Sequence, residues 1–209
     1  MAQASVIPEA LGEVIFSTNE QLVAQCYKDE TLSKAHKQRL FQGSIVRIES
    51  SYDNSHVAYG IIAKINNSSL DNIHKPQALG LTSKELKHLQ PQVYDLLRME
   101  LEIYLFAHTE GDKKIIKYPP LKPMMIHDFL YSANDEEALV FTEDFSNLIT
   151  VIKKNQLNPD LIVDLINLGY KLRGYNYTYL VESGKKLSLA FMDEVESLVG
   201  ILKRISPSK

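Results

Sequence analysis

The 209-residue chain has very little cysteine: Cys26 is the single one. One cysteine excludes an intramolecular disulfide and any metal site built from cysteines. The chain also lacks an excess of basic residues, with 23 Lys and Arg against 26 Asp and Glu and a formal charge of -3. A wholly basic surface for nucleic acid is therefore excluded, although a local basic patch is not.

Long apolar runs are missing as well, and none approaches the ~18 residues that a membrane-spanning helix needs. Residues 1–8 have no basic stretch followed by a long apolar run, so we expect no secretory signal and a cytoplasmic location. Hydrophobic residues make up 44% of the chain and charged residues 23%, which is ordinary for a globular protein. A chain of this length predicts one large domain, or one domain with an appendage.

The first two thirds of the chain predict short strands separated by turns. Strand-like runs cover 13–17, 22–27, 45–48, 57–65, 101–107, 115–116 and 124–130. Gly60 interrupts one of them, and a glycine inside a strand often marks a bulge where a small barrel bends. Short strands at nearly regular spacing favour a barrel or a sandwich over an α/β sheet.

A helical insertion is predicted within this strand region, over about 81–98. Thr82 and Glu85 fit a capping box, and apolar residues from Leu86 to Leu97 follow at helical spacing. Pro91 conflicts with one straight helix, so it predicts either a kink or a second short helix with Pro91 in its first turn.

The C-terminal quarter predicts helices. Asn158-Pro159 is a start signal and Gly174 a stop signal, and a second apolar stripe predicts a helix over 187–205. Residues 139–141 fit either a last strand or the start of a helix. The sequence therefore predicts an α+β fold, in which 1–145 form a small closed Greek-key β-barrel with a helical insertion and 146–209 form a helical subdomain.

Three segments are similar to a known family. They read Gly12-Glu-Val-Ile-Phe-Ser-Thr, Gly43-Ser-Ile-Val-Arg-Ile and Val57-Ala-Tyr-Gly-Ile-Ile-Ala-Lys-Ile. With a strand over 102–109, a proline-rich crossing over 118–123 and a closing strand over 125–130, they resemble the HAS barrel of HerA-type ATPases and of the α and β subunits of rotary ATP synthases. The likeness spans residues 10–131. It implies a barrel whose role is subunit contact rather than chemistry.

The motor domain that follows this barrel in the ATPases has no counterpart here. The nearest approach to a P-loop is Gly-Tyr-Lys-Leu-Arg-Gly over 169–174. Tyr175 and Asn176 stand where the motif requires Lys and then Ser or Thr to hold phosphate and Mg²⁺. We therefore expect a stand-alone barrel protein with no nucleotide site and no cofactor.

Local catalytic or metal-binding patterns are also missing. The six histidines include no pair at i, i+4 on one predicted helix, and none has a carboxylate at a known metal-ligand spacing. The neighbouring acids at 136–137, 143–144 and 193–194 do not face the same way on a helix, and Cys26 is expected to be a small buried side chain. We expect no metal site, no catalytic residues and no enzyme activity.

One cluster combines aromatic and basic side chains near the start of the C-terminal helices. Its possible interface residues are Tyr170, Arg173, Tyr175, Tyr177 and Tyr179. Tyrosine and arginine are common anchors of protein interfaces, and aromatic rings beside cations can also stack on nucleic acid bases. Packing between a helix and the barrel is the third interpretation.

The function hypothesis is a non-enzymatic protein-interaction or assembly module. Its partner would be another copy of the chain or a separately encoded ATPase. A nucleic-acid-binding barrel is the alternative, to which the basic residues Lys34, Lys37 and Arg39 would contribute. The remaining hypothesis is an enzyme whose active site is assembled from residues distant in sequence.

Overall fold

The computed structural model describes residues 9–28, 40–52, 56–71, 76–110 and 114–205. Its strands are β1 (Gly12–Ser17), β2 (Gln21–Cys26), β3 (Ile45–Glu49), β4 (Val57–Ser69), β5 (Leu97–Glu110), β6 (Lys114–Ile116) and β7 (Phe129–Ser132). Its helices are α2 (Ser83–Leu89), α3 (Pro91–Leu96), α4 (Asp135–Glu143), α5 (Ser146–Lys154), α6 (Asp160–Leu172), α7 (Tyr177–Ala190) and α8 (Val195–Ile205). The predicted α+β class is confirmed.

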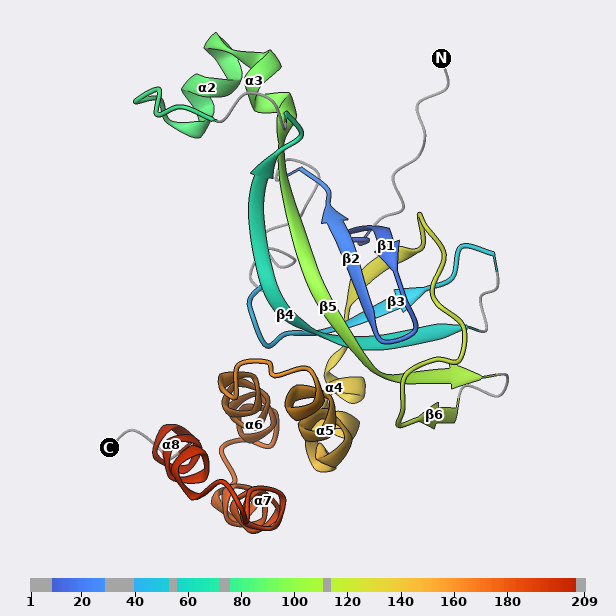
Figure 1. The fold of residues 1–209 in the computed structure, drawn as a ribbon, viewed down its shortest axis with the longest axis vertical. Helices are drawn as coiled ribbons and strands as arrows, with labels where there is room; N and C mark the ends of the chain where they lie inside the picture. The colour runs from blue at the N-terminus through green and yellow to red at the C-terminus, as the bar shows by residue number, and fades with distance from the viewer. Residues whose placement is uncertain (1–8, 29–39, 53–55, 72–75, 111–113, 206–209) are drawn as a thin grey trace.

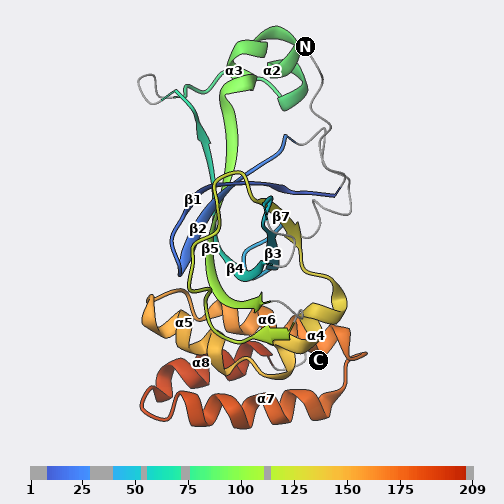
Figure 2. The same cartoon turned by 90° about the vertical axis from the view of Figure 1, so that its right-hand side faces the viewer.

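Six of these strands close into an antiparallel barrel (Figures 1 and 2). Their order is β2-β1-β7-β3-β4-β5, and the pairing of β5 with β2 completes the ring. Strand β7 lies between β1 and β3, so the chain crosses the barrel end to insert it, as in a Greek key. The short β6 pairs with the far end of β5. The predicted closed barrel is confirmed.

Aliphatic side chains fill the barrel because successive residues of a strand point to opposite faces. In β2, Leu22, Ala24 and Cys26 are buried and the residues between them are partly exposed. The pairing of β4 with β5 shifts between Tyr59 and Gly60, which is the bulge predicted at Gly60. A Cβ at Gly60 would collide with the side chain of Ile103, so the close approach of the two strands requires glycine there.

Strands β4 and β5 continue beyond the barrel as a two-stranded arm. Asn67, Ser68 and Ser69 pair only with residues 97–99, because β2 meets β5 from residue 100 onward. Helices α2 and α3 close the far end of this ribbon and project from the barrel (Figure 1). We call residues 67–71 and 76–99 the arm, and residues 79–97 within it the helical tip.

Helices α4 to α8 form a layer on the opposite side of the barrel from the arm (Figure 2). Tyr59 and Phe106, on the outer face of the barrel, each place their rings 4.9 Å from the ring of Phe141 in α4. The same continuous cluster includes Ile162 and Leu165 of α6, which are at most 1% exposed. The outer face of the barrel and the helices therefore share one core, which is separate from the cluster inside the barrel. This layer begins with α4, upstream of the predicted boundary between 145 and 146.

Glu137 caps α4 and also joins it to the barrel by two contacts. One carboxylate oxygen accepts a hydrogen bond from the Asn134 backbone in a capping box. The other accepts the Tyr59 hydroxyl at 2.9 Å and the Arg47 guanidinium at 3.1 Å. Burial raises the pKa of Tyr59, and the Glu137 carboxylate raises it further. These bonds fix the start of the helical layer relative to β3 and β4.

Several local predictions are confirmed. Thr82 and Glu85 form both bonds of the capping box of α2, and Pro91 occupies the first turn of a separate helix. Gly174 follows Arg173, the C-cap of α6, with a φ of +63°, the left-handed conformation that ends many helices. Residues 139–141 lie in a helix, which settles the alternative that the sequence left open.

Two predicted elements are wrong in extent. The helix predicted over 187–205 is two helices, because α7 ends at Ala190, just before the buried Phe191, and α8 begins at Val195. The strand predicted over 124–130 is limited to Phe129–Ser132. The chain before it is folded around the buried carboxylate of Asp128, which accepts the backbone N–H groups of Met125 and Ser51 at 2.7 Å.

Candidate protein-binding surface

The helical tip exposes a cluster of aliphatic side chains. Neither α2 nor α3, both fully described, contains a buried residue. Leu89 is 60% exposed, Leu79 44% and Leu97 39%, and Leu86 and Val93 are half-buried. Helices of six or seven residues are unstable alone in water and depend on packing of their apolar faces. An exposed apolar face of this kind is typical of a site that binds another protein.

Hydrogen bonds from the chain itself hold the tip in its helical form. The Thr82 N–H and the Thr82 hydroxyl each donate to Glu85 at 2.7 Å. These bonds lower the pKa of Glu85, because they favour its charged form. The Gln90 N–H ends α2 by donating to the Leu86 carbonyl at 2.8 Å.

Lys28, at the end of β2, ties the tip to the barrel. Its ammonium donates to the Tyr94 carbonyl and to the Asp95 carboxylate, each at 3.1 Å, and lies 4.9 Å from the centre of the Tyr94 ring. Because both groups belong to α3, the lysine sets the direction in which the tip projects. This role could not be predicted, since Lys28 is far from α3 along the chain.

The charges of the tip balance. Lys84 and Lys87 stand against Glu85 and Asp95, and Arg98, at the base of the arm, is ion-paired with Glu100 at 3.2 Å. Glu85 is held in the capping box and Asp95 is paired with Lys28. The exposed face of the tip therefore combines leucines with lysines.

A pocket of about 560 Å³ lies at the base of the arm. Tyr27, Lys28, Tyr94 and Arg98 contribute to its walls together with Cys26. Burial raises the pKa of Cys26 to about 12, so the thiol is protonated and unreactive at neutral pH. The pocket offers cations and aromatic rings but no activated nucleophile among these residues.

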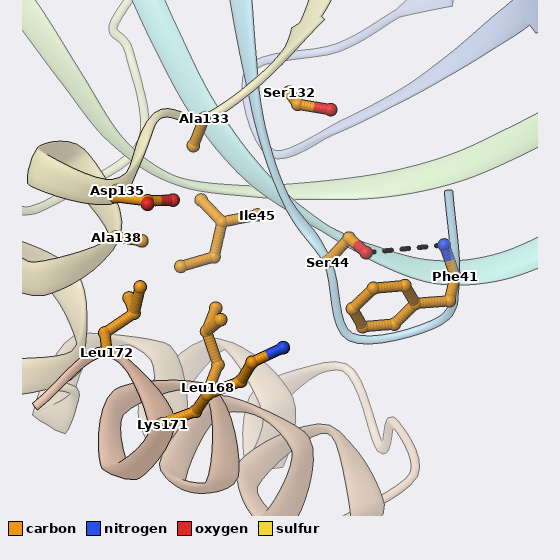
Figure 3. Close-up of a pocket in the computed structure, with 10 residues that line it drawn as sticks. All are labelled: Phe41, Ser44, Ile45, Ser132, Ala133, Asp135, Ala138, Leu168, Lys171 and Leu172. Carbon is orange, nitrogen blue, oxygen red and sulfur yellow. Dashed lines mark hydrogen bonds between the residues drawn. The ribbon is translucent and has the colours of Figure 1, made fainter. Parts of the chain in front are cut away.

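A second pocket, of about 290 Å³, lies where the barrel meets the helical layer. Figure 3 shows Ile45 of β3 pointing toward Leu168 and Leu172 of α6, with Asp135 and Lys171 as the charged residues of the lining. The walls are mainly aliphatic. This space is a seam between two packed parts, and its lining belongs to the same shared core.

The predicted tyrosine cluster divides into inward and outward members. The Tyr179 hydroxyl donates to the Thr142 carbonyl at 2.8 Å. Arg173 donates to the Leu139 carbonyl and to the Thr142 hydroxyl, and its guanidinium lies 4.4 Å from the centre of the Tyr179 ring. Both side chains thus satisfy groups at the C-terminal end of α4, where the helix dipole favours a cation.

The other three tyrosines lie nearer the surface. Tyr175 and Tyr177 are 63% and 64% exposed, and the half-buried Tyr170 packs edge-on against Tyr175 with ring centres 5.3 Å apart. The structure therefore separates Tyr179 and Arg173, which hold the helical layer together, from Tyr175 and Tyr177, which face solvent.

The remaining sites considered in the sequence can now be placed. Residues 169–174, the nearest approach to a P-loop, lie in α6 and its C-terminal end rather than in a loop after a strand. Among the described residues, no three His, Cys, Asp or Glu side chains gather closely enough to hold a metal ion. The basic residues Lys34, Lys37 and Arg39, and residues 1–8, lie outside the described residues.

No family model matches the chain, and no curated protein matches it. Within the described ranges, every helix is too short or too polar to cross a membrane.

Proposed function

We propose that this protein is a non-enzymatic assembly module that binds another protein through the helical tip of its arm. The single observation behind this proposal is the contrast in burial. Helices α4 to α8 each bury apolar side chains against the barrel or against one another, whereas α2 and α3 bury none. Short helices that keep leucines at the surface are best explained by a partner that covers them.

A separately encoded ATPase is the partner class that the resemblance of residues 10–131 to the HAS barrel favours. The barrel would then supply a subunit contact, as it does in those ATPases, and the motor would belong to another chain. This partner class rests on the resemblance alone, whereas the binding surface rests on the exposed leucines of the tip.

Affinity capture from native cells tests the proposal. The full chain is compared with a variant that carries Leu79→Ser and Leu89→Ser, both at exposed positions. We expect the captured protein, identified by mass spectrometry, to be lost with this variant. The matched control is Leu121→Ser, which changes a leucine that is 73% exposed outside the arm. Equal recovery with all three baits, or recovery of no protein and a strictly monomeric mass, would contradict the proposal.

Binding of single-stranded nucleic acid is the second candidate, and the pocket at the base of the arm favours it. Lys28 and Arg98 lie there beside Tyr27 and Tyr94, and cations beside aromatic rings suit the backbone and bases of a single strand. Fluorescence anisotropy of a labelled oligonucleotide at low salt decides between the candidates. Binding that is lost in Arg98→Ala would support it, and an unchanged signal at micromolar protein would end it.

A further inference from the structure

The pocket between the barrel and the helical layer is bounded by four elements. Residues of β3 and β7 and of the chain next to them form one side, and α4 and α6 form the other (Figure 3). Its volume of about 290 Å³ lies near the lower end of the range of about 300–1,000 Å³ that is typical of small-molecule sites. The pocket therefore has room for a small organic ligand.

Small side chains leave this space open within an otherwise packed contact. The buried Ala133, directly after β7, and the buried Ala138 of α4 line the pocket together with the half-buried Leu168 and Leu172 of α6. Contacts between packed elements are normally filled as densely as an organic crystal. A space that stays open between aliphatic walls therefore favours a ligand with an apolar body.

A tight turn holds the Phe41 ring at the rim of the pocket. The Phe41 N–H donates to the Ser44 hydroxyl at 3.3 Å, and the Ser44 N–H donates to the Phe41 carbonyl at 3.1 Å. Gly43, inside this turn, has a φ of +88°, a conformation that favours glycine. Because these contacts lie within the chain itself, the rim is in position before any ligand binds.

Lys171 of α6 is the charged residue of the lining that has no partner. It is exposed, and among the described residues no acceptor lies within hydrogen-bonding or ion-pairing distance of its ammonium. Asp135, which lines the pocket from α4, already interacts with another group of the protein. A carboxylate at the opening of the pocket would give Lys171 a charged acceptor, and hydrogen bonds between charged groups are the stronger kind.

We propose that this pocket binds a small aliphatic carboxylic acid. The hydrocarbon body lies between Ile45 of β3 and the leucines of α6, and the carboxylate accepts hydrogen bonds from the Lys171 ammonium. Burial of the body removes apolar surface of the ligand and of the walls from water, while the head group stays near solvent, where a charge is least costly. This inference goes beyond the proposed function, because it concerns another surface and another class of ligand.

Titration of the full chain with sodium hexanoate, followed by nuclear magnetic resonance of the side-chain methyl groups, tests the proposal. Hexanol and hexylamine are the matched probes, because they carry the same hydrocarbon chain with a neutral or a positive head group. For a ligand this small we expect a dissociation constant on the order of 1 mM. Hexanoate should shift the methyl signals of Ile45, Leu168 and Leu172, hexanol should bind more weakly, and hexylamine should bind most weakly.

Lys171→Gln separates the head group from the hydrocarbon body. It removes the charge at an exposed position, so hexanoate should bind at least about fivefold more weakly, whereas the affinity for hexanol should not change. The matched control is Lys203→Gln, which changes a lysine in the last turn of α8, outside the pocket. Hexanoate should bind this control as tightly as it binds the native chain.

Several outcomes overturn the inference. The absence of methyl shifts up to about 20 mM hexanoate, well above the expected dissociation constant, refutes binding, and shifts confined to other methyl groups refute this location. Hexylamine that binds as tightly as hexanoate, or an equal loss of affinity in both lysine variants, refutes the role of Lys171. None of these results bears on the capture experiment with Leu79 and Leu89, so the proposed function stands or falls separately.

Discussion

Helix α2 in the tip and helix α4 in the layer begin in the same way but differ in burial: α2 contains no buried residue, whereas α4 packs against the barrel. Each starts with a capping box, formed by Thr82 and Glu85 in α2 and by Asn134 and Glu137 in α4. The second carboxylate oxygen of Glu137 also binds Tyr59 and Arg47 of the barrel. By contrast, the Glu85 carboxylate accepts its two hydrogen bonds from Thr82, at the start of the same helix. Local sequence thus starts both helices, but only the capping glutamate of α4 also binds the barrel.

The largest difference should appear when the shared core is opened. Replacing Phe141 by alanine removes the ring that contacts both Tyr59 and Phe106, and a buried Phe-to-Ala change costs about 3–5 kcal/mol. We expect the free energy of unfolding, measured by urea denaturation, to fall by that amount. Leu89→Ala in the tip is the matched change and should stay within about 0.5 kcal/mol. An equal decrease in the free energy of unfolding for both variants would mean that Leu89 is also packed in a core.

The next effect concerns the contacts that only α4 has. Glu137→Ala leaves Arg47 and the Tyr59 hydroxyl without this acceptor and removes one half of the capping box. Losing hydrogen bonds to a largely buried charge predicts a decrease of about 2 kcal/mol in the free energy of unfolding. Glu136→Ala, at the exposed neighbouring position, is the control and should change little. A negligible loss with Glu137→Ala would show that the ion pair is not what holds α4 to the barrel.

A smaller and strictly local effect is expected in the tip. Thr82→Ala removes the side chain that accepts the Glu85 N–H, and loss of such a cap costs a helix about 1 kcal/mol. Amide hydrogen exchange in α2 should accelerate roughly fivefold, while exchange in β4 and β5 stays unchanged because the tip opens independently. Ser83→Ala, one position further on, serves as the control. Faster exchange throughout the barrel would show that the tip and barrel unfold together.

Acid should loosen the tip through the same capping box. The hydrogen bonds from Thr82 lower the pKa of Glu85 in the folded protein. A lowered folded-state pKa means that the stabilisation is complete above the ordinary glutamate value and is lost as the pH falls through the folded value. Chemical shifts of the α2 amides should therefore change in this acidic range. The change should be absent in Glu85→Ala, and its persistence there would assign it to another group.

Much of the barrel was predictable because its strands follow local rules. Alternation in β2, the bulge at Gly60, the capping box at Thr82 and the left-handed Gly174 each depend on a few neighbouring residues. The closed sheet followed from their order along the chain. The resemblance to the HAS barrel stays a prediction, as does the role of a protein partner.

What escaped prediction depends on contacts between distant residues. The apolar stripe over 187–205 continues on the same period through the turn at Phe191, so the pattern alone could not reveal the break between α7 and α8. Tyr179 and Arg173 looked like members of one cluster with Tyr175, but α4 lies against them and takes up their polar groups. The helical spacing of the leucines in the tip could be recognised in the sequence, whereas their exposure could be recognised only in the structure.

The length of the continuous strand β4 sets the distance between the helical layer and the arm. Its 13 residues run from the shared core near Tyr59 to the arm, and at about 3.3 Å per residue they span roughly 40 Å. Because side chains alternate with a period of two, removing two residues from each strand would shorten the reach by about 7 Å without turning any face over. The distance between the helical layer and the tip is thereby set by strand length, independently of the side chains that either surface carries.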